Sequence, residues 1–301
     1  MSFPPLKKTI LDIIECISQV RYEIGFPNMS IESIISGEPL KDVSFLKHSY
    51  RDRWFADPFI LEANDKYIVL LVEEFLYRTQ KGRIARLTID KTSKELIKNE
   101  VVLELDTHLS FPFIYRKEGV TYICPESSST SSWIFYEYDS NNNTILGKRE
   151  VIHLPLTDAI MDQYGFIYST LLPDPNSDSL RIYAMGDDGL YNEVKIIHFD
   201  EKIGRNAGAF FCFGGRLFRP AQESNYCYGH ATVIHELIQE NGTIVFRECN
   251  RFLSPHSLFH DGCHTLNVLD STCVIDVNGP RFPYLKMFIA WVYRLYFKLF
   301  K

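Results

Sequence analysis

The sequence predicts an all-β protein, a five-bladed β-propeller with a short helix at each end. The first observation is a hairpin pattern that occurs five times, an apolar strand followed by a tight turn and a second apolar strand. The second is its spacing, because the hairpins start near residues 56, 110, 157, 207 and 262, at intervals of about 45 to 55 residues. Repeats of this length with about four short strands each are typical of propeller blades. The alternative is a β-sandwich in which the spacing arises by chance.

The five hairpins contain strand-like runs rich in branched and aromatic residues, separated by residues that favour turns. In chain order they are "ADPFILEANDKYIVLLVEE", "SFPFIYRKEGVTYICPES", "TDAIMDQYGFIYSTLL", "AGAFFCFGGRLFRPAQ" and "GCHTLNVLDSTCVIDVNG". Between them lie further strand-like runs, "GRIARLTID", "WIFYEYD", "LRIYAMG" and "ATVIHELIQ". We therefore expect one ring of blades over residues 50–280. Residues 1–49 are expected to hold a helix and a lead-in strand, and residues 281–301 an amphipathic helix.

Polar residues recur where the first strand of a hairpin starts and where the second one ends. These two positions are neighbours in an antiparallel hairpin, so we expect Asp57 to lie close to Glu73 or Glu74. Because the innermost strand of each blade lines the channel of a propeller, the equivalent residues of all blades should meet at one mouth. They are Asp57, Ser110, Asp158, Gly208 and His264 at strand starts, and Glu73, Glu126, Arg219 and Gln222 at strand ends. The alternative for each of them is a solvated surface residue.

Composition narrows the class of protein. The 301 residues are 46% hydrophobic and 23% charged, as is ordinary for a globular protein. A net charge of -6 with 14% aromatic residues argues against a nucleic-acid partner and suits sugars better. The seven cysteines include no CxxC pair, and the N-terminus has an amphipathic helical pattern and not that of a signal peptide. We therefore expect free thiols and a cytoplasmic chain.

Short motifs at these positions resemble those of a known family. "WFADPFI", "EEF", "KGRIA", "LSFPFI", "PES", "RPAQ", "YG" and "HDGCHTLN" are similar, in this order, to the five-bladed propeller domain at the N-terminus of plant glucosamine inositolphosphorylceramide transferases. Similar bacterial proteins are encoded with surface-polysaccharide genes. The resemblance covers about residues 50 to 275. More distantly, the blade pattern is similar to the arabinanase, xylosidase and levansucrase clan. In that clan, carboxylates from the first three blades act as base or nucleophile, pKa modulator and general acid.

The resemblance implies roles for individual carboxylates. Asp57 in "ADPF" matches the base or nucleophile of the first blade. The aspartate of the second blade would fall around Ser110 and Pro112, where this chain has none. Glu126 in "PES" and Asp158 in "TDA" are then the candidates for the proton donor. The resemblance thus implies an incomplete hydrolase triad.

Glycosyl chemistry generally needs two carboxyl groups, one that donates a proton and one that stabilises or attacks the sugar. Asp57 with Glu126 or Asp158 would provide the pair, because neighbouring like charges raise one pKa and leave the other group ionised. Alternatively, these groups bind sugar hydroxyls or cap strand ends. Arg219 would offer a fork for the phosphate or carboxylate of a nucleotide-sugar or lipid-phosphate donor, the alternative being a structural salt bridge. Substrate contacts are expected from Glu73, Ser110, Arg219, Gln222, Tyr228 and His264.

A cluster of ligand-type side chains, namely His256, His260, Cys263 and His264, lies within "PHSLFHDGCHTLN". Their spacing matches no standard zinc finger, so we expect no zinc site and no cofactor. The resemblance adds one exception, since some clan members hold a metal ion on the channel axis at the position of His264. Hydrogen bonding or an axial metal contact by His264 alone is therefore the expectation.

The two ends of the chain carry apolar residues at helical spacing. Residues 6–20 are expected to pack against the propeller or another subunit. In residues 284–301, Lys286, Arg294, Lys298 and Lys301 fall on one third of the helix circumference, and aromatic residues fill much of the rest. This segment is too short and too charged for a confident membrane span, and it predicts an interfacial helix on an anionic membrane. The alternative is a helix buried on the propeller's side.

We therefore expect an enzyme on the inner face of a membrane that transfers or cleaves a glycosyl unit in surface-polysaccharide or glycolipid assembly. Its substrate would be a glycan, a nucleotide-sugar or a glycolipid. The alternative is a non-catalytic propeller that binds a glycan or glycolipid and positions a partner glycosyltransferase. A secreted glycosidase is disfavoured because no signal peptide is recognised.

Overall fold

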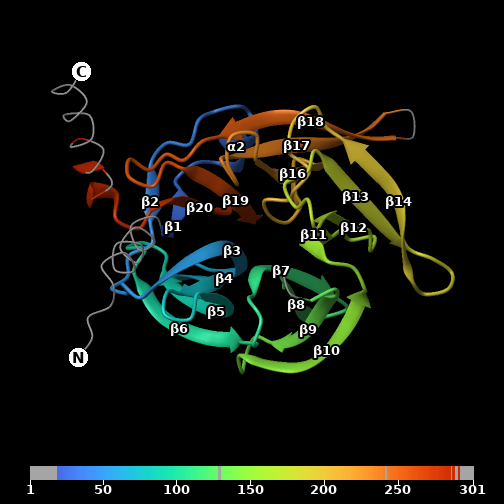
Figure 1. The fold of residues 1–301 in the computed structure, drawn as a ribbon, viewed down its shortest axis with the longest axis horizontal. Helices are drawn as coiled ribbons and strands as arrows, with labels where there is room; N and C mark the ends of the chain where they lie inside the picture. Colours follow the sequence, from blue (N-terminus) through green and yellow to red (C-terminus); the bar gives the residue numbers. More distant parts are fainter. Residues whose placement is uncertain (1–18, 128–129, 241–242, 286, 289–290, 292–301) are drawn as a thin grey trace, which may run out of the picture.

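Five antiparallel sheets of four strands each surround one axis in the computed structural model (Figure 1). The structure describes residues 19–127, 130–240, 243–285, 287–288 and 291. Each sheet is one blade, and successive hairpins in the sequence fill successive blades around the ring. The prediction of a five-bladed β-propeller is confirmed, and the β-sandwich alternative is excluded.

Four of the blades are built from consecutive strands, with the innermost strand first. Blade 1 holds β3 (Arg53–Ala63), β4 (Tyr67–Leu76), β5 (Lys81–Asp90) and β6 (Leu96–Leu103). Blade 2 holds β7 (Ser110–Lys117), β8 (Val120–Glu126), β9 (Trp133–Asp139) and β10 (Thr144–Ile152). Blade 3 holds β11 (Leu156–Met161), β12 (Ile167–Leu171), β13 (Ser179–Met185) and β14 (Tyr191–His198). Blade 4 holds β15 (Phe211–Phe213), β16 (Arg216–Glu223), β17 (Ala231–Glu240) and β18 (Thr243–Phe252).

Blade 5 combines the two ends of the propeller. Its inner strands are β19 (Gly262–Leu269) and β20 (Thr272–Pro280), and its outer strands are β1 (Val20–Pro27) and β2 (Val43–Phe45). The register of β1 on β20 runs from Val20 opposite Pro280 to Gly25 opposite Ile275. The segment predicted as a lead-in strand thus supplies two strands that close the ring. A short helix, α2 (Ile31–Ile35), lies between β1 and β2.

All five predicted hairpins form the inner strand pair of a blade. Two of their turns have both central residues at positive φ, Glu118-Gly119 at 52° and 80° and Gly214-Gly215 at 56° and 75°. These are the values of type I′ turns, whose twist matches that of the flanking strands. The turn sequences therefore set the register of these hairpins.

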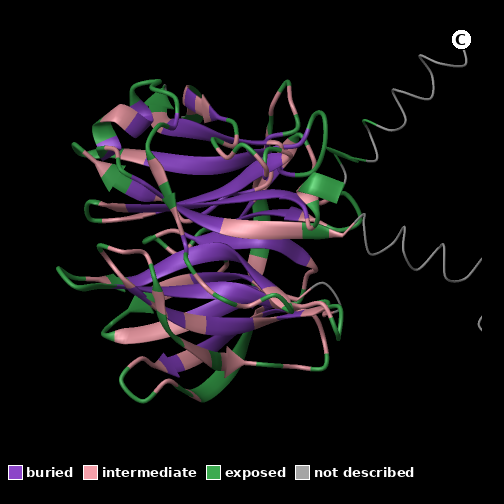
Figure 2. Ribbon diagram, turned by 90° about the vertical axis from the view of Figure 1, so that its left-hand side faces the viewer, coloured by how far each residue is buried: buried purple, intermediate pink, exposed green. Residues whose placement is uncertain are grey.

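The core lies between the blades, because the inner strands bury both of their faces (Figure 2). The largest cluster joins blades 1, 2 and 3 and includes Phe59, Phe111, Trp133 and Tyr183. Continuous apolar runs in the sequence are typical of such strands, which have no solvated face. The innermost strands are thereby held rigidly, and so are the residues at their ends.

The predicted N-terminal helix over residues 6–20 lies almost wholly outside the described residues, which begin at 19. Near the other end, the chain is helical at 283–285, 287–288 and 291, and the rest of the predicted C-terminal helix lies outside the described part. Among the described residues, no helix is both long and apolar enough to cross a membrane.

Candidate functional site

A β-bulge recurs at the start of the innermost strand in blades 1, 2, 3 and 5. The register shifts between Ala56 and Phe59, Ser110 and Phe113, Thr157 and Ile160, and Gly262 and Thr265. In blades 1 to 3 the residue that opens the bulge has a left-handed backbone, with φ of 49° at Asp57, 45° at Phe111 and 46° at Asp158. Such values are uncommon for residues other than glycine and cluster at functional sites. The bulge turns these positions toward the mouth of the channel.

A pocket of about 440 Å³ lies at this mouth. Blades 1, 2 and 5 contribute most of its wall, and the loops at residues 205 and 228 complete it. Its lining residues are Tyr22, Trp54, Asp57, Glu73, Phe75, His108, Ser110, Glu126, Arg205, Tyr228 and His264. Six of the nine residues predicted for the site line this pocket, namely Asp57, Glu73, Ser110, Glu126, Tyr228 and His264.

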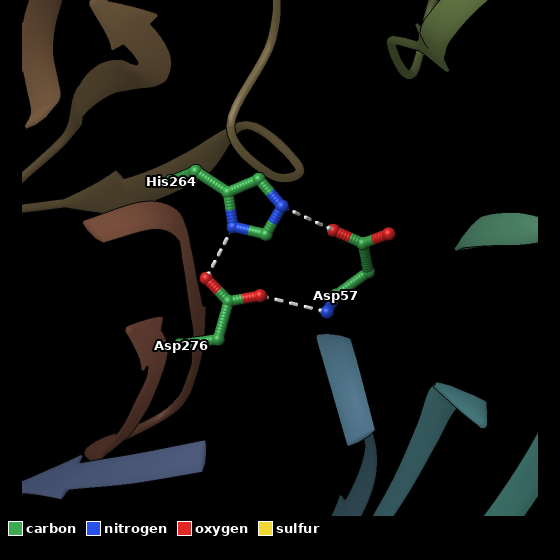
Figure 3. A group of neighbouring side chains, drawn as sticks. All are labelled: Asp57, His264 and Asp276. Carbon is green, nitrogen blue, oxygen red and sulfur yellow. Dashed lines mark hydrogen bonds and ion pairs between the residues drawn. The ribbon is translucent and has the colours of Figure 1, made fainter. Parts of the chain in front are cut away.

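Asp57, His264 and Asp276 form a hydrogen-bonded chain in the wall of the pocket (Figure 3). His264 Nδ1 lies 2.5 Å from Asp276 Oδ1, and its Nε2 lies 3.4 Å from Asp57 Oδ1. The backbone N–H of Asp57 donates to Asp276 Oδ2 at 2.8 Å, and that of Phe111 donates to Asp57 Oδ2 at 3.0 Å. Both ring nitrogens of His264 therefore face carboxylates, which fixes the imidazole in place.

The two partners of this chain that line the pocket have shifted pKa values. Burial raises the pKa of Asp57 to about 7, with repulsion from Asp276 and Asp158 adding to it and attraction to His264 opposing it. Burial alone would lower the pKa of His264, but the charge and hydrogen bond of Asp276 raise it to about 8. Near neutral pH, an imidazolium at His264 thus faces an Asp57 carboxyl that is poised between its two protonation states.

Glu73 and Glu126 occupy the same place in blades 1 and 2, since Glu73 pairs with Ala56 and Glu126 with Ser110. Burial, with repulsion from Asp57 and Glu126, holds the pKa of Glu73 well above its usual value. Burial and repulsion from Asp158 raise the pKa of Glu126 to about 8, although Arg205 opposes the shift. These carboxyls therefore favour their protonated forms.

The predicted closeness of Asp57 to Glu73 or Glu74 is confirmed for Glu73, whose strand partner Ala56 adjoins Asp57. Glu73 Oε1 lies 3.3 Å from His108 Nε2 and has no hydrogen-bond partner among the described residues. Glu74 is fully buried, and its carboxylate contacts Arg53 at 2.7 Å and Arg83 at 2.6 Å. Glu73 thus lines the pocket with one buried, unpaired oxygen, whereas Glu74 holds the blade together.

Asp158, Arg219 and Gln222 do not line the pocket. Asp158 Oδ2 accepts hydrogen bonds from Arg205 Nε and Gln222 Nε2, both at 2.6 Å, so Asp158 anchors the guanidinium of Arg205 from behind. Arg219 is fully buried and donates to Asn206 Oδ1 at 2.8 Å and to two backbone carbonyls. Burial lowers the pKa of Arg219 to about 9. The expected fork for a substrate anion is therefore not at Arg219, and the guanidinium at the pocket is that of Arg205.

Aromatic rings form the rest of the pocket wall. The rings of Trp54 and Phe75 are stacked, with a centroid distance of 4.6 Å and an interplanar angle of 6°. Tyr22 lies against both Trp54 and His264, at 4.7 and 5.0 Å. The Tyr228 ring lies 4.9 Å from the Arg205 guanidinium carbon. The pocket thus combines flat apolar surfaces with ionisable groups, as ligand sites commonly do.

Sequence reasoning missed six residues of the pocket and its support, namely Tyr22, Trp54, Phe75, His108, Arg205 and Asp276. Two of them could have been predicted from their position in the sequence, since Trp54 and Phe75 directly flank the segment of the first hairpin. Asp276 could not have been, because it pairs with Thr265 inside β20, whereas the position equivalent to Glu73 and Glu126 is Asn278, opposite Gly262. Tyr22 and Arg205 come from other parts of the chain, and only the closed ring brings them to the pocket.

The four ligand-type residues in the segment 256–264 are not brought together as one group of neighbouring donor atoms. His256 Nδ1 accepts two backbone N–H groups, and Cys263 is buried beside Thr232. Within the described ranges, the group of three potential ligands whose donor atoms lie within 4.8 Å of one another is Asp57, His264 and Asp276.

An axial metal ion at this group would need ligand atoms that are free. Asp276 already accepts from His264, Thr265 N and Asp57 N. Only His264 Nε2 and Asp57 Oδ1 then remain, fewer than the three protein ligands typical of catalytic zinc sites. The residues present therefore fit a hydrogen-bonded chain and do not by themselves fit a metal centre.

This fold and pocket define a five-bladed β-propeller with buried ionisable groups at one mouth of its channel. The chain belongs to the family described as "Glucosamine inositolphosphorylceramide transferase 1, N-terminal", whose model matches residues 38–254. Glucosamine inositolphosphorylceramide transferase 1 of Oryza sativa subsp. japonica is 26% identical over 201 residues, and that of Arabidopsis thaliana is 28% identical over 200. Each match covers 62% of this chain but only 27% and 26% of the plant proteins, respectively.

Among solved structures, a GH43 β-xylosidase/α-arabinofuranosidase from a compost microbial metagenome, in complex with xylotriose, aligns with a TM-score of 0.48 at 12% identity. The alignment covers 75% of this chain and 85% of that one. A GH43_1 enzyme from Xanthomonas citri with xylotriose has a TM-score of 0.48 at 10% identity, covering 77% and 88% of the two chains.

Proposed function

We propose that this propeller acts on a glycan, and that the carboxyl groups at the pocket transfer or cleave a glycosyl unit. The observation that carries the proposal is the set of three carboxyls with raised pKa values, Asp57, Glu73 and Glu126, around one aromatic-walled pocket. Strongly perturbed carboxyls in a cleft are typical of catalytic acids and bases. The printed name of the plant relatives, glucosamine inositolphosphorylceramide transferase 1, supports carbohydrate chemistry.

The roles follow from the protonation states. Glu126, with a pKa of about 8, is protonated at neutral pH and serves as the proton donor to the leaving oxygen. Asp57, with a pKa of about 7, is the group that is ionised in an appreciable fraction of molecules and serves as base or nucleophile. The Phe111 N–H and the His264 imidazolium stabilise its charge and orient it.

Other pocket residues hold the sugar. Phe75 is half-buried and stacks on the buried Trp54, so its ring offers an apolar surface against which a sugar ring can pack. Glu73, which lines the pocket, offers its carboxyl group to a hydroxyl group of the ligand. Arg205 offers the guanidinium for a donor that carries a phosphate or carboxylate, the role first expected of Arg219. Its Nη2 lies 3.7 Å from Glu126 Oε2, so an anion bound there would also affect the proton donor.

A second function is favoured by one observation in blade 2. Phe111 occupies the bulge position that Asp57 and Asp158 occupy in blades 1 and 3. The carboxylate that the glycosidase clan would place in this blade is therefore absent. A non-catalytic propeller that binds a glycan and positions a partner glycosyltransferase is the alternative that this substitution supports.

The test is to measure binding and turnover of oligosaccharides, nucleotide-sugars and glycolipids by the wild type, Asp57→Asn and Glu126→Gln. Each substitution keeps the shape of the side chain but removes its charge or its acidic proton, and should lower turnover by about 10² or more. Asp187→Asn, an exposed acid away from the pocket, is the matched control and should be silent. If the pocket only binds, both variants weaken binding and no substrate turns over. Unchanged binding and turnover in both variants would refute the site.

A further inference from the structure

The face of the ring that carries the pocket also carries the start of the C-terminal helical segment. The Arg281 N–H donates to Gln19 O at 2.8 Å, which ties this segment to the residue before β1. The Arg281 guanidinium lies 3.5 Å from the centroid of the Tyr77 ring and donates to Arg51 O at 3.4 Å. Tyr77 follows Phe75 of the pocket wall by two residues. The segment therefore leaves the propeller beside the aromatic wall of the pocket.

The described residues of this segment expose large apolar side chains. Tyr284 is 72% exposed, Met287 61%, Phe288 58% and Trp291 59%. Exposed aromatic and apolar side chains of this density mark an interaction surface. The alternative of a helix buried on the propeller's side does not hold for these residues.

The charge of residues 281–301 indicates which kind of partner this apolar surface binds. Residues 281–301 contain five cations and no Asp or Glu. Aromatic residues together with Lys and Arg are typical of helices that lie in the interface of an anionic membrane. A second copy of the chain would bring the same positive charges against them, and repulsion disfavours that partner.

We propose that the surface formed by Arg281, Tyr284, Met287, Phe288 and Trp291 docks on an anionic lipid bilayer, and that the propeller then lies with the mouth of its pocket toward the headgroups. The orientation follows from the fixed start of the segment at Arg281, since its bonds to Gln19 and Arg51 place the bilayer on the pocket's side. The inference does not depend on the chemistry proposed for the pocket, because docking and its orientation stand whether the pocket binds or transforms a glycan.

The opposite face of the propeller also exposes apolar residues and is the alternative docking surface for a membrane. Tyr164 is 77% exposed there, and Met185 and Leu190 are 59% and 65% exposed. The exposed acids Asp187 and Asp188 lie in the same turn as these apolar residues. Anionic headgroups repel such acids, so this face is disfavoured against the same membrane.

Vesicle sedimentation tests the docking surface. The wild-type chain should bind vesicles of phosphatidylcholine with phosphatidylglycerol more strongly than vesicles of phosphatidylcholine alone, and less strongly at high salt. The double variant Phe288→Glu/Trp291→Glu, at two exposed positions, should bind the anionic vesicles about tenfold more weakly or worse. Met185→Glu/Leu190→Glu on the opposite face is the matched control and should bind as the wild type does. Unchanged binding of the first variant, or loss of binding only in the control, overturns the proposal.

The native cysteines test the orientation. Cys227 is exposed in the loop that carries Tyr228, and Cys212 is exposed in the wall of the opposite mouth. In a background with Cys16 and Cys249 replaced by Ser, a polarity-sensitive thiol probe is placed on Cys227 or Cys212 with the other replaced by Ser. Anionic vesicles should shift the emission of the probe at Cys227 to the blue and leave that at Cys212 unchanged. A shift at Cys212 alone, or equal shifts at both, contradicts the orientation.

Discussion

Blades 1 and 2 build the same bulge and use it for different purposes. Asp57 opens the bulge of blade 1 with φ of 49°, and Phe111 opens that of blade 2 with φ of 45°. The Asp57 carboxyl lines the pocket, whereas the Phe111 ring is fully buried in the cluster that joins blades 1, 2 and 3. The two positions are also partners, because the Phe111 N–H donates to Asp57 Oδ2.

The difference teaches that the repeat supplies backbone geometry and the individual side chain supplies chemistry. A left-handed residue at this point directs its backbone N–H and its side chain away from the regular ladder. In blade 2 the backbone N–H of Phe111 contributes to the site, because it binds the Asp57 carboxyl, and the Phe111 ring packs in the core. In blade 1 the side chain of Asp57 itself lines the pocket. Substitutions at the two positions should therefore separate stability from activity.

The largest effect is expected from Phe111→Ala. Removing a fully buried phenyl ring from a core typically lowers the free energy of unfolding by about 3–5 kcal/mol. Urea denaturation followed by tryptophan fluorescence measures the change, with Asp57→Asn as the control at the equivalent position. Asp57→Asn should lower stability far less, because it removes a buried charge and keeps the shape. A smaller loss in Phe111→Ala than in Asp57→Asn would reverse the comparison.

Blade 3 extends the comparison, because its bulge residue is an aspartate that faces away from the pocket. Asp158→Asn removes the charge that anchors Arg205 and should lower the free energy of unfolding by about 2 kcal/mol. Its effect on turnover should be smaller than that of Asp57→Asn, since Arg205 can still reach the pocket. Thermal melting and the pH profile of turnover measure the two effects. A loss of turnover as large as in Asp57→Asn, with full stability, would place Asp158 among the reacting groups.

The pH dependence of stability should carry the signature of the buried carboxyls. The pKa of Asp57 is about 7 against its ordinary 3.8, and that of Glu126 about 8 against 4.5, so the folded chain holds protons that the unfolded chain has released. His264, at about 8 against 6.5, shifts in the same direction. Stability from these groups is present at low pH and is lost as the pH rises through the folded values.

The measurement is urea denaturation at a series of pH values between about 4 and 8, a window set by these pKa values. Stability should fall across this range, and in Asp57→Asn the fall below about pH 7 should be shallower. Phe111→Leu is the matched variant that should leave the slope unchanged. A rise in stability with pH, or an unaltered slope in Asp57→Asn, would show that Asp57 is ionised in the folded state throughout.

The smallest effect is a local one at His264. Asp276→Asn removes the charge that chiefly raises the pKa of His264, which should then fall below about 8, since only the weaker contributions of Asp57 and Asp158 still oppose burial. Titration of the imidazole by NMR measures the shift. Asp261→Asn, in the loop before β19, is the control. An unchanged pKa at His264 would mean that Asp57 supplies the stabilising charge.

Much of the fold was readable because the hairpins are local. The turns at Glu118-Gly119 and Gly214-Gly215 and the apolar runs beside them are specified by adjacent residues, and the spacing then implies the ring. The pairing of β1 with β20 could not be predicted from the sequence, because no residue pattern within β1 identifies it as a strand of blade 5. The sequence therefore placed residues 20–49 before the ring, although β1 and β2 belong to it.

The site was readable only where it lies on a hairpin. Asp57, Glu73 and Glu126 follow from strand position. The side-chain direction at Arg219 did not follow, because one-residue differences in a strand turn a side chain to the other face and a continuously buried strand such as β16 shows no alternation. Arg205 and Tyr22 lie on segments whose place depends on ring closure, which no local pattern reports.

The closure of blade 5 sets the order in which the protein can be completed during synthesis. Gln19 and Arg281 are bound to each other across 262 residues, so β1 leaves the ribosome long before its partner β20 exists. At usual translation rates the delay is on the order of ten to fifty seconds. Throughout this time the strand that carries Ile24 and Phe26 has an unpaired edge and an uncovered apolar face. Of the strands in the ring, β1 is therefore exposed to aggregation for the longest time, and a chaperone that holds β1 would be of most use to the nascent chain.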